Sequence, residues 1–336
     1  MELLQYKPNT NEPTISIIVP MYNEERHIEA CLKSIINLNY PKDKIELIVV
    51  DDGSQDDTVS IAAKFDPLIL KTHHLGCANA RNIGVSNANG EIIAFLDADD
   101  LCKDNWIKEI VPYFDDEKVG AIGCSHDLLN TPKSDIIQIS FKEKCFRHML
   151  SPCRTDHIGA SGCLVRKNVF LNVGGFTSSL RAAEDSDLSN KIREINFDII
   201  LIKEPLISVT YPNKLSQYFL NQIRNSSYHT IFILNRIKRV TGNKYSGMLD
   251  YIQSILPSIF ICSMVLSPGK LNILVALILL LFLINIHFFR YLLNSKKELS
   301  NFWPINAMIY LTVRSIAWNI GLFNGIFLYL CKTIRS

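Results

Sequence analysis

Short apolar runs alternate with segments of helical periodicity along the first 124 residues, and this alternation constrains the possible fold most strongly. Four runs have the short length and the branched apolar residues that are typical of buried strands: Ile15–Pro20, Ile45–Val50, Leu68–Lys71 and Ile92–Leu96. Each is followed by a segment with the spacing of a helix: Glu24–Leu38, Thr58–Phe65, Ala78–Ala88 and Trp106–Phe114. Strands and helices in this order form right-handed βαβ units, which predicts an α/β fold with a parallel sheet.

The pattern continues less regularly after residue 124. A strand is predicted at Val119–Cys124, and from Leu128 to Asp156 we expect loops around one short strand, Ile136–Phe141. Regular structure then returns with a strand that ends at Val165, a turn at Gly174-Gly175, a helix at Asp185–Glu194 and a strand at Ile199–Ile202. The first 212 residues therefore read as one domain with a full core.

Composition excludes several classes of protein. The chain has 336 residues and a formal charge of only +2, which gives no electrostatic footprint for nucleic acid. Its nine cysteines include no C-x-x-C pair, which indicates reduced thiols on a cytosolic face and argues against a structural zinc site. The polar start, MELLQYKPNTNEPT, does not have the pattern of a signal peptide.

The stretch IIAFLDADD, residues 92–100, combines a buried strand with three carboxylates at its end. Open α/β sheets hold their ligands at the carboxyl ends of strands. Asp97 and Asp99 are two residues apart, so both carboxylates could reach one hard cation that also carries phosphate oxygens. Asp100 could be a second ligand or a helix cap for the segment from Asn105, and we favour the cap.

Two further polar motifs follow strands one and two. They are PMYNEE (residues 20–25) and VDDGSQDDT (residues 50–58), whereas G-x-G-x-x-G and G-x-x-x-x-G-K-[ST] are absent from the sequence. A tyrosine at such a strand end can stack on a base, and a carboxylate can accept a hydrogen bond from a base N–H. Taken alone, Asp51–Asp57 is somewhat better explained as a turn and helix cap.

Four motifs occur together in a fixed order: SIIVPMYNEE, VVDDGSQDDT, GCANARNIGVSNANGEIIAFLDADD, and GGF followed by AEDSDL. In order and spacing they resemble family 2 glycosyltransferases of the GT-A fold. The resemblance covers about Thr14–Tyr211. It implies a Rossmann-like, mostly parallel sheet flanked by helices, and a nucleotide-sugar donor such as a UDP- or GDP-sugar.

The resemblance also implies roles for particular residues. Pro20, Tyr22 and Glu24 would border the nucleotide, Asp52 would read the base, and Arg81 would lie near the base or diphosphate. Of the D-x-D pair, Asp97 would hold the ribose and contribute to a cation site, and Asp99 would be the direct metal ligand. Mg²⁺ or Mn²⁺ suits such oxygen ligands, and the metal would neutralise charge on the leaving diphosphate.

A second acidic pair, Glu184-Asp185, resembles the ED motif of the same family. By that resemblance Asp185 is the general base that deprotonates an acceptor hydroxyl, which gives inversion at the anomeric carbon. The alternative is an acid in the first turn of a helix, stabilised by the helix dipole. Residues assigned to the acceptor or diphosphate region are Glu184, Gly162 and Arg224, and His157 is a further neighbour of the acceptor.

The C-terminal part predicts a membrane module. The 19 residues of Leu271–Phe289 contain no Asp, Glu, Lys or Arg and, as a helix, would span about 28 Å, close to the thickness of the hydrocarbon core. Tyr251–Leu266 would complete a hairpin with this segment. Basic residues flank both ends of the pair, so the positive-inside rule places the catalytic domain in the cytosol, in a multi-pass membrane protein.

The third apolar segment, Ile305–Leu330, contains Arg314. Its polar residues fall on one arc of a helix, so it could lie in the interface or span the membrane with that arc against other protein. We favour a span. Residues 213–250 interleave aromatic and basic side chains, as helices on an anionic membrane surface do. They lack the Gln-x-x-Arg-Trp motif of processive family members, because Gln222-Ile223-Arg224-Asn225 departs from it.

The sequence as a whole predicts a catalytic domain (residues 1–212), interfacial helices (213–250) and a transmembrane region (251–336). The predicted activity is inverting, metal-dependent transfer of a single sugar to a hydroxyl of a membrane-bound acceptor, preferably a polyprenyl-linked saccharide. The main alternative is a polyprenyl-phosphate glycosyltransferase, whose acceptor is already anionic. A catalytically inactive scaffold that binds nucleotide sugar or lipid is a third. The sequence does not fix the donor base, the sugar, the choice of metal or the oligomeric state.

Overall fold

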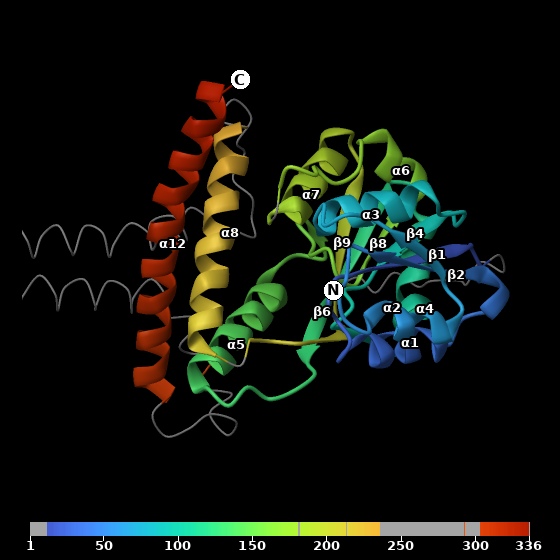
Figure 1. Ribbon diagram of the computed structural model, residues 1–336, viewed down its shortest axis with the longest axis horizontal. Coiled ribbons are helices and arrows are strands. Elements are labelled where there is room, and N and C mark those ends of the chain that lie inside the picture. Colours follow the sequence, from blue (N-terminus) through green and yellow to red (C-terminus); the bar gives the residue numbers. More distant parts are fainter. Residues whose placement is uncertain (1–11, 181, 213, 236–291, 293–302, 336) are drawn as a thin grey trace, which may run out of the picture. The chain divides into compact units, whose positions relative to one another are not determined.

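The computed structural model describes residues 12–180, 182–212, 214–235, 292 and 303–335 (Figure 1). The chain divides into two compact units. An α/β unit comprises residues 1–129 and 151–210, and a helical unit comprises residues 130–150 and 211–336. Residues 130–150, which the sequence analysis included in the first domain, group with the C-terminal helices.

One sheet of nine strands forms the centre of the α/β unit, and eight of them follow the order β3-β2-β1-β4-β8-β6-β9-β5, with β7 beside β9. The strands are β1 (Ile15–Met21), β2 (Ile45–Asp51), β3 (Leu68–Lys71), β4 (Ile92–Phe95), β5 (Leu101–Cys102), β6 (Val119–Leu128), β7 (Arg154–Thr155), β8 (Cys163–Arg166) and β9 (Asp198–Val209). The first four confirm the predicted strands to within one residue. Each is a short aliphatic run bounded by turn-forming residues, which is the strongest strand signal in a sequence.

Strand directions correct one prediction. The pairs β1–β2, β2–β3, β1–β4 and β6–β9 are parallel, whereas β8 is antiparallel to both β4 and β6, and β5 and β7 are antiparallel to β9. The sheet is therefore mixed, and the expectation of a mostly parallel sheet was wrong. Strict strand–helix alternation holds only as far as β4, and the later strands are joined by connections that reverse the chain direction.

Helices cover both faces of the sheet (Figure 1). They are α1 (Ile28–Ile36), α2 (Thr58–Ala62), α3 (Cys77–Ser86), α4 (Trp106–Ile110), α6 (Lys167–Asn172) and α7 (Glu184–Glu194). All seven residues of β1 are buried, as expected for a central strand covered on both sides. Helix α3 approaches β1 closely at Gly84, where a Cβ atom would lie 2.5 Å from Ile18 Cγ2. This close packing fixes α3, which carries Arg81.

The helical unit contains α5 (Asp135–Leu150), α8 (Leu215–Asn235) and α12 (Trp303–Arg335). Helix α5 overturns the prediction of loops around a strand at Ile136–Phe141. The run IIQISF has the composition of a strand, but the helix that contains it also buries Glu143, which bonds to Tyr310 and Arg314 far away in the sequence. Contacts with distant parts of the chain therefore make this segment helical, against its local preference for a strand.

Helix α12 places its polar residues against α5 and α8, as its periodicity predicts. Arg314 and Tyr310 both hydrogen bond to Glu143 of α5, and Asn306 Nδ2 donates to Asp135 Oδ2 at 2.9 Å. Burial by itself raises the pKa of Glu143, but Arg314 and Arg147 outweigh it and bring that pKa to about 2. Within the described residues, Pro304–Cys331 is the helix whose length and composition could cross a membrane. The predicted hairpin at 251–266 and 271–289 lies outside them.

Candidate active site

The carboxyl ends of β1, β2 and β4 come together at one edge of the sheet. Met21 of β1 pairs with Asp51 of β2, and Phe95 of β4 pairs with Ile18. A cavity of about 190 Å³ opens at this edge. Six residues that the sequence singled out line it, namely Pro20, Tyr22, Glu24, Asp52, Asp97 and Asp99, together with Met21, Cys77, Ala80 and Ala98. The structure thus brings together the side chains predicted for the donor.

Two loops that form one wall of the cavity are joined by backbone-to-side-chain hydrogen bonds. The N–H of Asn23 donates to Ser54 Oγ at 3.0 Å, and the N–H of Gln55 donates back to Asn23 Oδ1 at 2.8 Å. The N–H of Glu24 donates to Thr58 Oγ1 at 2.7 Å. Asn23 has a φ of +55°, a left-handed conformation that asparagine tolerates better than most residues. These contacts hold Tyr22 and Glu24 at the cavity.

Asp52 organises the loop after β3. Its Oδ1 accepts hydrogen bonds from Thr72 Oγ1 at 3.0 Å and from the Leu75 N–H at 2.7 Å, and its Oδ2 accepts one from the Gly76 N–H at 2.8 Å. A carboxylate has about four acceptor positions, so one on Oδ2 remains for a ligand. The same loop carries His74, whose ring lies 4.4 Å from that of Tyr22, centroid to centroid.

Asp99 is the most perturbed acid of the cavity. Burial, and then the negative charges of Asp97 and Glu24, raise its pKa to about 6. The raised pKa of Asp99 indicates that the carboxylates around it lack a neighbouring positive charge. A divalent cation would supply that charge. Asp100 does not cap the following helix as predicted: Asn105 is the N-cap of α4. The Asp100 carboxylate instead accepts a hydrogen bond from Ser161 Oγ at 2.6 Å.

Arg81 links the two acidic motifs. One guanidinium nitrogen, Nη2, lies 2.6 Å from Asp97 Oδ1, and the other, Nη1, lies 3.0 Å from Glu184 Oε1. The Arg81 side chain is only 3% exposed. It also lies over the ring of Phe176, 5.4 Å from the centroid. The prediction near the base or diphosphate did not anticipate this bridge, because Glu184 is more than a hundred residues away in sequence.

The second acidic motif opens helix α7. Asp185 accepts a hydrogen bond from the Ser186 N–H at 2.7 Å, and its Oδ2 lies 3.8 Å from His157 Nε2. The Asp185 carboxylate is 29% exposed, so it remains accessible to a second substrate. Burial and the neighbouring charge of Asp185 raise the pKa of Glu184, and Arg81 offsets part of that effect. Arg81 thus holds Glu184, and Asp185 is the more exposed of the two acids.

Asn82, which the sequence reasoning missed, fastens the turn before α7. Its side-chain amide donates to the Phe176 carbonyl at 2.8 Å and accepts from the Phe176 N–H at 3.0 Å. The turn itself is formed by Gly174 and Gly175, both at positive φ. Gly162, assigned to the acceptor region, has a φ of +78°, and a Cβ there would lie 2.5 Å from Ile207 Cγ1. This close packing by itself explains the glycine.

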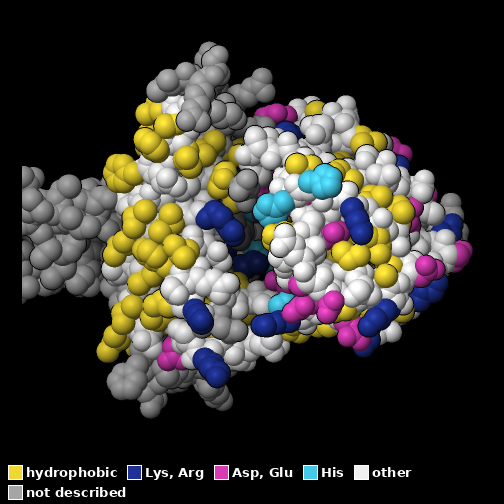
Figure 2. Space-filling model, in the orientation of Figure 1, with side chains coloured by type: hydrophobic (Ala, Val, Ile, Leu, Met, Phe, Trp, Pro, Cys, Tyr) yellow, Lys and Arg dark blue, Asp and Glu magenta, His cyan; other side chains and the backbone are white. Residues whose placement is uncertain are grey.

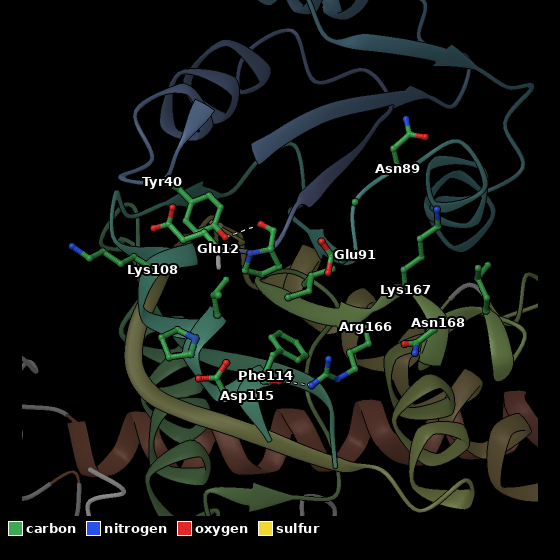
Figure 3. A pocket seen from close by; sticks show the side chains of 16 residues that line it. Glu12, Tyr40, Asn89, Glu91, Lys108, Phe114, Asp115, Arg166, Lys167 and Asn168 are labelled. Carbon is green, nitrogen blue, oxygen red and sulfur yellow. Dashed lines mark hydrogen bonds between the residues drawn. The ribbon is translucent and has the colours of Figure 1, made fainter. Parts of the chain in front are cut away.

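A larger cavity, of about 740 Å³, lies at the opposite edge of the sheet, where β1 and β4 begin (Figure 3). Three of its polar side chains are bonded to the backbone: Tyr40 Oη donates to the Pro13 carbonyl at 2.7 Å, Lys167 Nζ donates to the Ala88 carbonyl, and Arg166 Nε donates to the Val119 carbonyl. Ligands of open α/β sheets bind at the carboxyl ends of strands, so we assign the chemistry to the smaller cavity.

The donor set fits a cation that is shared with a substrate. No group of three His, Cys, Asp or Glu side chains suited to a metal occurs in the described part of the chain. Mg²⁺ is commonly held by one or two carboxylates together with substrate phosphates, and Asp97 and Asp99 supply that number. Arg224 lies exposed on α8 in the helical unit, and its approach to a diphosphate stays a prediction.

The chain is similar to known proteins in both sequence and fold. Residues 16–172 match the model of Glycosyl transferase family 2. This stretch is a family 2 glycosyltransferase domain. The chain is 29% identical over 212 residues to the probable glycosyltransferase YdaM of Bacillus subtilis, an alignment that covers 58% of this chain and 50% of YdaM.

It is also 36% identical over 117 residues to the glycosyltransferase AglE of Haloferax volcanii, which covers 33% of this chain and 38% of AglE. The chain thus spans half or less of the length of these relatives. Among solved structures, the mannosyltransferase PcManGT of Pyrobaculum calidifontis, in complex with GDP-Man and Mn²⁺, has a TM-score of 0.60 at 21% identity. That match covers 94% of this chain and 89% of PcManGT and shows a common GT-A-like fold.

Proposed function

We propose that this protein is an inverting, metal-dependent glycosyltransferase that moves one sugar from a nucleoside-diphosphate donor to a hydroxyl of a membrane-bound acceptor. The observation that carries the proposal is the Arg81 bridge, which holds the D-x-D aspartate Asp97 and the ED-motif glutamate Glu184 on one guanidinium. Their neighbours Asp99 and Asp185 then serve the two substrates of one reaction.

The donor half binds the nucleotide and its diphosphate. Tyr22 is 40% exposed at the cavity and can stack on a base, while the free acceptor position of Asp52 can take a base N–H. Asp97 can accept a hydrogen bond from a ribose hydroxyl on its second oxygen, because its first is bonded to Arg81. The relatives named above support a nucleotide-sugar donor, and a UDP- or a GDP-sugar is equally compatible with these groups.

Asp99 and Asp97 would hold Mg²⁺ or Mn²⁺. When bound, the cation would neutralise the charge that develops on the departing nucleoside diphosphate. PcManGT contains Mn²⁺, which supports the same type of cofactor here. The contribution of this chain is a carboxylate whose raised pKa reflects a shortage of positive charge in the cavity.

Asp185 is the proposed general base. The Ser186 N–H orients its Oδ1, and His157 approaches its Oδ2. A hydroxyl that donates to Asp185 loses its proton as it attacks the anomeric carbon on the face opposite the diphosphate, which inverts the configuration. Base catalysis of this kind contributes about 10² to 10⁴ in rate. An acceptor with a hydroxyl nucleophile, such as a polyprenyl-linked saccharide, requires this step.

A membrane location completes the proposal. The predicted hairpin at 251–266 and 271–289 would anchor the chain in a bilayer, with the catalytic unit on the cytosolic side where nucleotide sugars occur. A lipid-linked acceptor would then be confined to the same surface as the enzyme. Polysaccharide or glycolipid synthesis is the process that this combination serves.

Two experiments test the proposal. Thermal shifts with a panel of nucleotide sugars, with and without Mn²⁺, should identify a donor that raises Tm only when the metal is present. In Asp99→Ala this metal-dependent rise in Tm should be lost. Transfer is then measured with the identified donor to a polyprenyl-linked saccharide and to polyprenyl phosphate, for the unmodified enzyme and for Asp185→Asn. Loss of transfer to the saccharide in Asp185→Asn supports the base. Near-full activity of that variant on polyprenyl phosphate would instead favour the anionic acceptor.

A further inference from the structure

Helix α12 has two unlike faces. Ile305, Ile309, Ile320, Phe323, Phe327 and Leu330 are all exposed, and at 100° per residue they fall within an arc of about 80° that we call the outer stripe. Figure 2 shows hydrophobic side chains gathered along this helix. Apart from Thr312, which is also exposed within this arc, the stripe is apolar, and an apolar stripe of this length on an exposed surface indicates a contact with an apolar phase or partner.

The opposite face of α12 packs against α5 and α8 between Asn306 and Gly325. Gly321 and Gly325 allow close approach to α8, since a Cβ on either would lie 2.5 Å from α8 atoms. Ser226 Oγ donates to the Trp318 carbonyl at 2.8 Å, and Asn324 Nδ2 donates to Ser227 Oγ at 3.0 Å. With Arg314 bonded to Glu143, this face satisfies its polar groups inside the unit. The outer stripe is therefore the surface that α12 offers to something else.

Helices α8 and α12 run parallel (Figure 1). Tyr218 faces Tyr310, Trp318 Nε1 donates to Gln222 Oε1, and Ser227 contacts Asn324, so residue numbers rise together along both helices. If α12 crossed a bilayer, α8 would have to cross beside it. The two helices must therefore be considered together.

The exposed face of α8 is incompatible with such a crossing. It carries Gln217, Arg224 and Asn225 beside the apolar Leu220, all exposed. Arg224 and Asn225 directly precede Ser226, which contacts Trp318 near the middle of α12, so a span would put both side chains near the centre of the bilayer. A charged arginine near the centre of a bilayer is strongly unfavourable.

We propose that α12 lies in the plane of a phospholipid bilayer, with the outer stripe in the acyl-chain region and α8 on the aqueous side. An amphipathic helix with one continuous apolar face and its polar face covered has the properties of an interfacial helix. A bilayer is favoured as the partner because the chain between α8 and α12 contains the uncharged run of residues 271–289. This assignment is independent of the catalytic proposal, and it replaces our expectation that residues 305–330 span.

Depth-dependent fluorescence quenching tests the proposal. Ile309→Trp, Ile320→Trp and Phe327→Trp place reporters at three points of the outer stripe, and Gln217→Trp is the matched control on the exposed face of α8. The full-length variants are reconstituted in liposomes of phosphatidylcholine and phosphatidylglycerol in which the acyl chains are brominated either near the ester end or near the methyl end. The unmodified protein supplies the background from its native tryptophans.

An in-plane helix gives the same loss of fluorescence at the three stripe positions, larger with bromine near the ester end, and no loss at the control. A spanning helix gives the largest loss at Ile320→Trp with bromine near the methyl end, with shallower quenching at the other two, and would overturn the proposal. Absence of quenching at all three positions in membrane-bound protein would also overturn it, and would assign the stripe to another protein surface or a second copy.

Discussion

Replacement of Arg81 by methionine removes the cation that Asp97 and Glu184 share. Methionine keeps most of the length and volume of the side chain, so the change isolates the charge and its hydrogen bonds. Loss of one partner from a buried ion pair costs about 3–5 kcal/mol, because the remaining charges are left unpaired. Here the Asp97 and Glu184 side chains are 35% and 18% exposed and can recover some hydration, so we take the lower end of that range.

A loss of about 3 kcal/mol lowers Tm by about 6–12 °C, since each kcal/mol corresponds to about 2–4 °C in a domain of 150–250 residues. Thermal unfolding followed by tryptophan fluorescence is a suitable assay, because Trp106 is fully buried in the α/β unit. Arg81→Lys should fall between methionine and the native protein, because a single ammonium group does not reproduce the fork that reaches both carboxylates.

A double variant identifies the cause. In Arg81→Met with Glu184→Gln, one of the two unpaired charges is gone, so the loss should be smaller than the sum of the single losses, with a coupling of about 0.5–3 kcal/mol. The matched control is Lys33→Met, which breaks the Lys33–Glu29 pair, equally short at 2.6 Å but with both side chains more than half exposed. We expect no measurable change in its Tm. If Arg81→Met lowered Tm no more than Lys33→Met does, the Arg81 bridge would not stabilise the fold.

Three further outcomes are expected. Asp185→Asn should lower kcat by about 10² to 10⁴ with donor binding unchanged, whereas Asp187→Asn should mainly lower Tm, since Asp187 is buried and paired; equal rate losses in both would contradict the assignment of the base. The pKa of Asp99 is raised to about 6, so its ionised form opposes folding. In thermal melts without metal, Asp99→Asn should therefore be more stable than the native protein above about pH 6, and this gain in stability should disappear towards pH 4. A gain that did not depend on pH would exclude this cause. Arg314→Met should destabilise by about 2 kcal/mol in chemical denaturation, and Glu143→Gln in the same chain should recover part of it; additive losses would mean that the pair is not coupled.

The sequence predicted the parts of the site that depend on strand ends. Tyr22, Asp52 and Asp99 follow strands whose apolar runs are unambiguous, and parallel neighbours bring such ends together at one edge. The cavity lined by these residues follows from local pattern and simple topology. Their individual roles toward a ligand remain predictions.

Contacts between segments distant in sequence were not predictable in the same way. Arg81 was expected near the diphosphate, yet its guanidinium joins Asp97 to Glu184, and nothing in the local sequence of α3 specifies that partner. The cap assigned to Asp100 failed for a similar reason, because Ser161 competes for its carboxylate from another strand connection. Sequence order places residues on elements, whereas the pairing of buried charges depends on the finished packing.

The charge of Arg314 affects the interpretation of α12 as a membrane helix. Hydropathy averages the whole circumference of a helix, so an apolar outer stripe raises the mean even when the other face carries Arg314, Tyr310 and Asn324. Separated by face, the residues that bond to α5 and α8 are polar or small, whereas most of the exposed residues of α12 are apolar. Arg314 is therefore not an interruption of a span. Its partner Glu143 fixes which side of α12 turns inward, and that choice leaves the outer stripe as the surface available to a bilayer.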